Sequence, residues 1–322
     1  MQSNGMCANM KFDKLLLYDF RGSDFLSNGL KDFCKEMVVL RTDKDFSGDM
    51  NPESLKGADA FVAKPFGNYD KNFLSKADKL KYFGLVSTSY AVVDVGFLKK
   101  KGVAFTNVPH YATEAVAELT FSVLLEMARK TGDALIKAKD DYTGKRDMGW
   151  ELKGRTIGII GLGDIGKRIA ELAKGFGMDV LYYSRTKKPD IEKGFGIKHV
   201  ELDVLLEKSD VVSLNLSLNE KTEGILSRDK LMMLKDGAMV LNSARAELCD
   251  LDAVKELSES KNLFFWFDAL DEKEQRAKVL SSKNVIATPH VGWMTKEAQK
   301  RLDVVALENV KNYLGGKPTN MV

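Results

Sequence analysis

The most restrictive feature of this sequence is a glycine-rich turn between a run of β-branched residues and an amphipathic helix. Residues 156–160 read Thr-Ile-Gly-Ile-Ile, which predicts a short buried strand. The turn after it carries Gly161, Gly163 and Gly166, and Ile169 lies on the apolar face of the helix. In such a turn the first glycine permits a tight bend, the second lets a pyrophosphate approach the backbone, and the third lets helix and strand pack closely. The helix N-terminus favours a dianion, so this stretch predicts a dinucleotide site.

Composition and charge are those of an ordinary globular chain with room for two domains. The 322 residues include 49 basic and 46 acidic side chains, a formal net charge of +3. That charge is too small to favour nucleic acid or an anionic membrane as a partner. Cys7, Cys34 and Cys249 have neither CxxC nor metal-ligand spacing, so we expect no metal site and a reduced, cytoplasmic setting. No signal peptide or membrane-spanning segment is expected either.

Strands and helices alternate along the chain, which predicts parallel sheets covered by helices on both faces. The strands expected in a first sheet are residues 15–18, 37–40, 60–63, 80–86 and 103–108, with a helix at 25–35. A long helix at 113–130, with apolar residues along one side, precedes the glycine motif. The strands expected in a second sheet are residues 156–160, 179–183, 211–216, 238–242, 263–267 and 285–288.

Two α/β domains follow from this order, a substrate-binding domain at 11–110 and a dinucleotide-binding domain at 111–291. The final helix, 296–314, comes too late to join the second sheet. We therefore expect residues 292–322 to complete the first domain, with a cleft between the domains. Ligands of parallel sheets bind at the carboxyl ends of strands. The turns at 64–68 and 87–89 are thus candidate substrate loops, and plain strand-to-helix connections are the equal alternative.

The side chains that could perform chemistry follow strands of the second domain. His110 lies at a domain crossing and could be a hinge residue, and His199 lies in a polar stretch typical of a solvated surface. His290 directly follows a strand, which makes it the best general acid/base. Arg245 also follows a strand and could hold a carboxylate by two parallel hydrogen bonds, or simply cap the next helix. The acids that could pair with His290 and orient its ring are Asp268, Asp271, Glu272 and Glu274.

With these residues the chain resembles the D-isomer-specific 2-hydroxyacid dehydrogenases, the family of glyoxylate/hydroxypyruvate reductases, D-lactate dehydrogenases and phosphoglycerate dehydrogenases. The matching stretches include Val116-Ala-Glu118, residues 152–161, Asn242-Ser-Ala-Arg245, residues 284–290, and Gly316-Lys-Pro318. The resemblance implies a flavodoxin-like substrate domain joined to a Rossmann dinucleotide domain. It also implies NAD(P)-dependent interconversion of a small 2-keto acid and its D-2-hydroxy acid.

The same resemblance implies roles for individual residues. Arg245 would bind and polarise the keto acid, His290 would donate a proton to the carbonyl oxygen, and a glutamate would support His290. The implied substrate residues are Phe66, Gly67, Asn68, Ser87 and Thr88. The implied cofactor residues are Gly161, Gly163, Asp164, Ile165, Gly166, Ser184, Arg185, Thr186, Lys187, Leu216, Ser217, Thr222, Ser243, Ala244, Asp268 and Gly292. A homodimer joined through the nucleotide domains is implied as well.

The supporting glutamate is the least certain of these assignments, because the position where the family carries it is occupied by Lys273. Spacing from Arg245 selects Glu274, whereas spacing back from Asn284 selects Glu272. Both remain candidates at this stage.

Two other functions compete with a 2-keto acid reductase. A non-catalytic NAD(P)-sensing protein could keep the fold and recruit partners, although Arg245, nearby glutamates and His290 favour an enzyme. Formate dehydrogenases of the family place glutamine where the supporting glutamate would be, so they are disfavoured. The sequence leaves the particular acid open.

Charge at the end of the second nucleotide-domain strand predicts the cofactor. NAD-preferring sites of this fold carry an acid about 20 positions past the glycine motif. Here no acid occurs between Asp179 and Asp190, and the turn instead reads Ser184-Arg-Thr-Lys-Lys188. Cations form charge-assisted hydrogen bonds to a 2′-phosphate, so we expect NADP(H) to be preferred, with NAD(H) as the alternative. A solvated basic turn is the plain interpretation.

Overall fold

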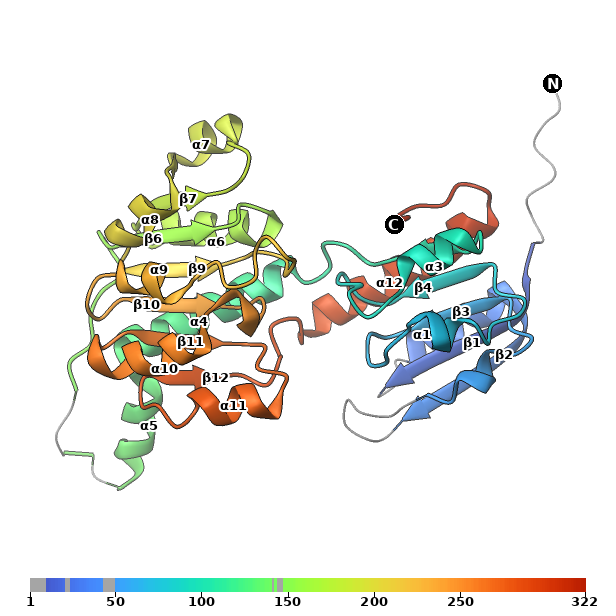
Figure 1. Cartoon of the computed structure of the whole chain (residues 1–322), viewed down its shortest axis with the longest axis horizontal. Helices are drawn as coiled ribbons and strands as arrows, with labels where there is room; N and C mark the ends of the chain where they lie inside the picture. Colours follow the sequence, from blue (N-terminus) through green and yellow to red (C-terminus); the bar gives the residue numbers. More distant parts are fainter. Residues whose placement is uncertain (1–9, 21–23, 43–49, 141, 144–146) are drawn as a thin grey trace. The chain divides into compact units, whose positions relative to one another are not determined.

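The chain folds into two compact α/β units (Figure 1). The computed structural model describes residues 10–20, 24–42, 50–140, 142–143 and 147–322; Cys7 lies outside them. One unit contains Met1–Tyr111 and Thr295–Val322, and the other contains Ala112–Met294. The C-terminal helix α12 (Lys296–Leu314) therefore belongs with the first unit, where it contacts α1 (Asp24–Leu30).

The first unit is built on a five-stranded parallel sheet with the strand order β2-β1-β3-β4-β5, which is the flavodoxin-like order. Its strands are β1 (Phe12–Phe20), β2 (Cys34–Thr42), β3 (Ala60–Ala63), β4 (Tyr82–Leu85) and β5 (Ala104–Thr106). Besides α1 and α12, its helical segments are η1 (Lys31–Phe33), η2 (Pro52–Leu55), α2 (Lys71–Leu74) and α3 (Val95–Lys100).

The helix expected at 25–35 is shorter than the sequence suggests. It ends at Leu30, a single 3₁₀ turn follows, and β2 already begins at Cys34. The reason is sheet pairing, because Cys34 lies opposite Phe12 in the β1–β2 register and its side chain is buried. Tertiary pairing here overrides a local pattern compatible with helix.

The second unit is built on a seven-stranded parallel sheet with the order β12-β11-β10-β9-β6-β7-β8. Its strands are β6 (Thr156–Ile160), β7 (Asp179–Tyr183), β8 (Lys198–His199), β9 (Val211–Leu214), β10 (Met239–Asn242), β11 (Phe264–Phe267) and β12 (Val285–Ala287). Its helical segments are α4 (Thr113–Arg129), α5 (Thr131–Asp140), α6 (Asp164–Gly175), α7 (Pro189–Phe195), α8 (Leu202–Lys208), α9 (Arg228–Met232), η3 (Ala246–Leu248), α10 (Leu251–Ser260) and α11 (Lys273–Val279).

This strand order reverses direction between β6 and β9, and that reversal locates the ligand crevice. From β6 the chain builds outward to β7 and β8 on one side, then returns to β9 and builds outward on the other. Open parallel sheets bind ligands outside the carboxyl ends of the strands at such a switch point. The glycine turn follows β6 directly, so it lies at this edge.

Helix α4 lies where it was expected, and its apolar side is covered within its own unit, where Val116, Val123 and Leu124 are buried. Lys130 ends α4 in the left-handed conformation, with φ of 52°, and α5 follows without having been predicted. In Figure 1, α5 projects away from the sheet of its unit. The described part of the chain contains no helix with both the length and the hydrophobicity of a membrane-spanning segment.

Candidate active site

The glycine turn after β6 is packed against backbone at Gly161 and Gly166 and faces open space at Gly163. Gly161 has φ of +95°, and a Cβ there would lie 2.6 Å from the carbonyl oxygen of Asn215. A Cβ on Gly166 would lie 2.1 Å from the carbonyl oxygen of Gly161, so helix and turn touch through backbone alone. Gly163 is exposed, with nothing within 4 Å of its Cβ position. Asp164 and Ile165 then begin α6. A phosphate could approach this backbone from the open side.

The neighbouring end of β9 adds a polar group at the switch point. The side-chain oxygen Oδ1 of Asn215 is buried and has no hydrogen-bond partner among the described residues, while its Nδ2 donates to Ser213. Beyond it, Leu216 is half-buried and Ser217 is exposed. The Thr222 hydroxyl donates to the Ser217 carbonyl oxygen at 2.7 Å, which closes this loop. An acceptor left unsatisfied and a glycine cradle that a Cβ would fill both fit a dinucleotide at this edge.

The basic turn after β7 presents its cations to solvent. Arg185, Thr186 and Lys187 are exposed, and no hydrogen bond or ion pair joins Arg185 or Lys187 to any other residue that the structure describes. The Ser184 hydroxyl donates to the Thr186 carbonyl oxygen at 2.6 Å, so it shapes the turn. Both cations are therefore available to an anionic ligand.

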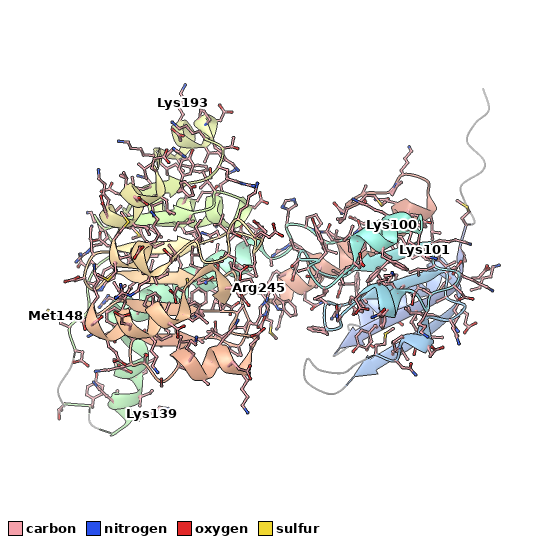
Figure 2. All side chains as sticks on the ribbon, viewed as in Figure 1. Lys100, Lys101, Lys139, Met148, Lys193 and Arg245 are labelled. Atoms are coloured by element: carbon pink, nitrogen blue, oxygen red, sulfur yellow. The ribbon has the colours of Figure 1, made fainter. Side chains whose placement is uncertain are left out.

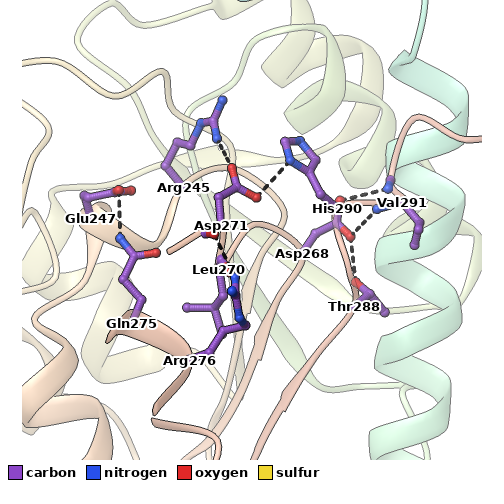
Figure 3. Close-up of polar contacts among 11 residues, drawn as sticks. Arg245, Glu247, Asp268, Leu270, Asp271, Gln275, Arg276, Thr288, His290 and Val291 are labelled. Atoms are coloured by element: carbon purple, nitrogen blue, oxygen red, sulfur yellow. Dashed lines mark hydrogen bonds and ion pairs between the residues drawn. The ribbon is translucent and has the colours of Figure 1, made fainter. Parts of the chain in front are cut away.

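Across the sheet, the ends of β10, β11 and β12 bring an arginine, an acid and a histidine together (Figure 3). Arg245 Nη1 donates to Asp271 Oδ2 at 2.6 Å. The other carboxylate oxygen of Asp271, Oδ1, lies 3.1 Å from His290 Nδ1. We call these three residues the Arg–Asp–His chain. Their side chains are 37%, 48% and 39% exposed, so all three can meet a ligand.

The protonation of this chain follows from the pKa of its central acid. The hydrogen bond from His290 is the largest cause that lowers the pKa of the Asp271 carboxyl below 3.8; the charge on Arg245 acts in the same direction and partial burial opposes them. Asp271 is thus ionised at neutral pH and can only accept hydrogen bonds. His290 Nδ1 must then carry a hydrogen, which leaves Nε2 as the nitrogen that exchanges a proton with a ligand.

The backbone around His290 is held by a buried carboxylate. Asp268 is 2% exposed; its Oδ1 accepts from the Thr288 hydroxyl and the Val291 N–H, and its Oδ2 accepts from the Gly292 N–H at 2.8 Å. His290 itself has φ of 54°, a conformation that non-glycine residues adopt only when their surroundings enforce it. A Cβ on Gly292 would lie 2.6 Å from Asp268 Oδ2, so a side chain at this position would displace that carboxylate.

Arg245 and Asp271 are positioned in the same manner. The buried side chain of Asn242 accepts from the Ala244 N–H at 3.0 Å and donates to the Arg245 carbonyl oxygen at 2.7 Å, so it fixes the Ser243–Arg245 turn. On α11, Arg276 Nη1 donates to the carbonyl oxygens of Leu270 and Asp271 at 2.6 and 2.7 Å (Figure 3). The acid in the middle of the chain thus sits on a backbone held from both sides.

The expected substrate loops lie in the first unit, after β3 and β4. The Phe66 N–H donates to the Lys64 carbonyl oxygen, and a Cβ on Gly67 would lie 3.0 Å from the Tyr69 ring. After β4, the Thr88 hydroxyl donates to the Val108 carbonyl oxygen at 2.8 Å. Within the described part of the chain, the N–H groups of Ser87 and Thr88 donate to no other residue. Such unpaired backbone donors suit a carboxylate.

Comparison with known proteins identifies the family. Residues 121–292 match the sequence profile of the D-isomer specific 2-hydroxyacid dehydrogenase NAD binding domain. A glyoxylate reductase of Thermococcus litoralis is 33% identical over 84% of this chain and 85% of its own length. A hydroxypyruvate reductase of Blautia hydrogenotrophica is 33% identical over 78% of this chain and 81% of its own.

This chain belongs to the D-isomer-specific 2-hydroxyacid dehydrogenase family. The fold agrees with that membership. The crystal structure of D-lactate dehydrogenase from Aquifex aeolicus, complexed with NAD and lactic acid, superimposes with a TM-score of 0.83 at 26% identity and covers 94% of this chain and 96% of that one. The predicted fold class, two parallel-sheet domains of which one is a Rossmann domain, is confirmed.

For a member of this family, the acid beside His290 is a departure. Neither expected glutamate makes a hydrogen bond or ion pair with the histidine among the described residues: Glu272 directly precedes α11, Glu274 lies in the first turn of α11, and both are exposed. The partner of His290 is Asp271, which lies in the loop before the helix. Of the four acids that could pair with His290, the structure brings Asp271 to it, because Asp271 lies in the loop before α11 whereas Glu274 lies within the first turn of that helix.

Other functional candidates were missing from the sequence-based site. Asn242 and Arg276 position the Arg–Asp–His chain. In the sequence, the only signal for Asn242 is its place at the polar end of a buried strand, and Arg276 has no such signal. The expectation of a solvated His199 is wrong: it lies in β8, is half-buried, and packs edge-on against Tyr182 with ring centroids 5.1 Å apart. His110, at the unit boundary, has φ of 63°.

Proposed function

We propose that this enzyme reduces a small 2-keto acid, glyoxylate or hydroxypyruvate, to its D-2-hydroxy acid and prefers NADPH to NADH. The observation that carries the reaction is the Arg–Asp–His chain at the carboxyl edge of the dinucleotide sheet. The two substrates are those named for the curated relatives.

The role of each residue in the Arg–Asp–His chain follows from the side-chain atoms that its contacts with the other two residues leave available. Arg245 uses Nη1 for Asp271, and no hydrogen bond engages its Nε or Nη2 among the described residues, so these donors can hold the keto acid. His290 donates the Nε2 proton to the carbonyl oxygen, while Asp271 holds the ring and stabilises its charged form. The bound nicotinamide supplies the hydride. The N–H groups of Ser87 and Thr88, which donate to no described residue, receive the substrate carboxylate together with the Phe66–Asn68 turn.

The proposed cofactor preference rests on the charge of the turn after β7. Arg185 and Lys187 are exposed and unengaged within the described residues, and this turn carries no acid that would bind ribose hydroxyls or repel a 2′-phosphate. A guanidinium presents a planar fork that matches phosphate oxygens. We therefore assign the larger contribution to Arg185.

The test is steady-state oxidation of NADPH and NADH with glyoxylate, hydroxypyruvate, pyruvate and 2-ketoisocaproate. We expect turnover with NADPH and a higher kcat/KM for glyoxylate or hydroxypyruvate than for the two larger or more apolar acids. If the protein binds NADPH tightly but turns over none of these acids, the result would favour the non-catalytic NAD(P)-sensing function over the reductase.

We also propose a homodimer joined through the nucleotide units. The support comes from α5 and the segment after it, where Leu135, Ile136, Tyr142 and Met148 are 69%, 65%, 77% and 91% exposed (Figure 2 labels Met148). Large apolar side chains that are exposed close together in the sequence are typical of an interface. Light scattering at micromolar concentration should give twice the mass of one chain, and Leu135→Asp with Ile136→Asp should shift it toward one. A wild type with the mass of a single chain would reject the dimer.

A further inference from the structure

The turn Ser184–Lys188 contains a third cation that is used differently from Arg185 and Lys187. Lys188 is half-buried, and its Nζ donates to the carbonyl oxygen of Leu162 at 2.6 Å. Leu162 lies between Gly161 and Gly163 in the glycine turn. The side chain of Lys188 therefore ties the basic turn to the phosphate-binding backbone after β6, and its ammonium is already engaged.

The backbone of Lys188 is held by a buried hydroxyl. Tyr182, on β7, is 0% exposed; its hydroxyl accepts from the Lys188 N–H at 2.9 Å and donates to Glu192 Oε1 at 2.7 Å. This relay links strand β7, the turn and helix α7 beyond it. Because the tyrosine is buried in the sheet, it fixes the end of the turn without reaching its outer surface.

The beginning of the turn is held as well. His199 Nε2 lies 3.3 Å from the Ser184 carbonyl oxygen, and the Ser184 hydroxyl donates to the Thr186 carbonyl oxygen. Fixed points therefore occur at Ser184, Thr186 and Lys188. Between them stand Arg185 and Lys187, exposed and without a hydrogen bond or ion pair to any described residue.

We propose that Tyr182 and Lys188 are positioning residues for cofactor discrimination: without touching the 2′-phosphate, they hold the turn so that Arg185 and Lys187 are presented to it. This inference rests on the proposed NADPH preference. Its physical basis is preorganisation, since a turn already fixed in its binding conformation loses less conformational freedom when the ligand arrives. Cations on an unfixed turn would carry the same charge and discriminate less.

Tyr182→Phe tests this inference because it removes one hydroxyl and changes no charge. Tyr183→Phe is the matched control, since Tyr183 is adjacent on β7 and its hydroxyl bonds to no described residue. Calorimetric titration with adenosine 2′,5′-bisphosphate and with 5′-AMP gives an affinity ratio that reports recognition of the 2′-phosphate. We expect Tyr182→Phe to lower this ratio about tenfold and Tyr183→Phe to leave it unchanged, with 5′-AMP affinity similar in all three proteins.

Lys188 provides the second variant. Lys188→Met should lower the same ratio, and Lys188→Arg, which can still donate to the Leu162 carbonyl oxygen, should retain most of it. Thermal unfolding of each variant shows whether it is folded at the temperature of the titration.

The outcomes separate two failures. A wild type that binds both nucleotides equally overturns the proposed cofactor preference and this inference with it. A wild type that favours the bisphosphate, with a ratio that Tyr182→Phe leaves intact or that Tyr183→Phe lowers equally, overturns the positioning role alone. A loss of 5′-AMP affinity as large as that of the bisphosphate would also overturn it, because the relay would then support nucleotide binding in general.

Discussion

The two ends of the dinucleotide sheet's carboxyl edge handle charge in opposite ways. At the β10–β12 end, Arg245, Asp271 and His290 are paired with one another. At the β7 end, Arg185 and Lys187 have no partner among the described residues. Both ends rest on a fixed backbone, the first through Asn242, Asp268 and Arg276, and the second through the relay described above.

This difference follows from what each end must do. Proton transfer requires a donor in one tautomer at one place, and a chain of charged partners enforces both. A phosphate that does not react can be bound by positive charge at the right distance. Cations without an ion-pair partner can bind it without first breaking an existing ion pair. Substitutions at the first end should therefore change turnover, and those at the second end should change the choice of cofactor.

The largest effect is expected for His290→Asn. Asparagine keeps a polar side chain but cannot donate a proton as an acid, so kcat should fall by about 10²–10⁴-fold. Cofactor affinity, measured by the change in NADPH fluorescence on binding, should remain near that of the wild type. A variant with nearly the normal kcat would show that His290 is not the proton donor. The pairing of residues at the β10–β12 end would then not serve proton transfer.

Asp271→Asn should have the next largest effect, a loss of about 10–10³-fold in kcat, because an amide can donate to His290 Nδ1 and stabilise the wrong tautomer. Glu272→Gln and Glu274→Gln are the matched controls, and both should be close to the wild type in kcat. A severe loss in either glutamine variant, with a mild one in Asp271→Asn, would return the supporting role to a glutamate.

The pH dependence of this chain has a definite sign. Since the pKa of the Asp271 carboxyl is lowered below 3.8, its interactions are present above that ordinary value and are lost only as the pH falls through the lower folded value. A kcat profile measured from pH 5 to pH 9 should therefore contain no step due to Asp271. If a step in the wild-type profile disappears selectively in Asp271→Glu, the acid is not ionised throughout this range.

At the β7 end, Arg185→Ala should lower kcat/KM for NADPH by about 10–150-fold, which corresponds to the roughly 1.5–3 kcal/mol of one charge-assisted hydrogen bond. The value for NADH should change little, because the ribose hydroxyl offers no dianion to the guanidinium. The ratio of the two values in wild type and variant is the measurement. An equal loss with both cofactors would mean that Arg185 supports the turn rather than reading the phosphate.

The sequence predicted the glycine turn and every strand except the two-residue β8, because the signals of these elements are local. β6, β7 and α12 have the expected bounds, and Arg245 and His290 follow their strands as expected. The acid between them was not resolved, because Asp271, Glu272 and Glu274 differ only in where the loop ends and α11 begins. Asn242 and Arg276 act through backbone carbonyl groups of the folded chain, and these contacts depend on which loops meet after folding.

The smallest predicted effect, for Lys187→Ala, separates steering by charge from a directed contact. An ammonium on a flexible stem is a point charge without a fixed fork, and Lys187 is exposed, so its loss should lower kcat/KM for NADPH by only about 2–5-fold, in the range of an exposed ion pair. Interactions of this kind are screened by salt. The effect of Lys187→Ala should therefore largely disappear as potassium chloride is raised from 0.05 to about 0.5 M, whereas that of Arg185→Ala should persist in part because its hydrogen bonds are directional. Equal salt dependence in both variants would mean that the β7 end acts on NADPH only through its overall positive charge. The hydrogen bonds of Tyr182 and Lys188 would then have no directed contact with the phosphate to position.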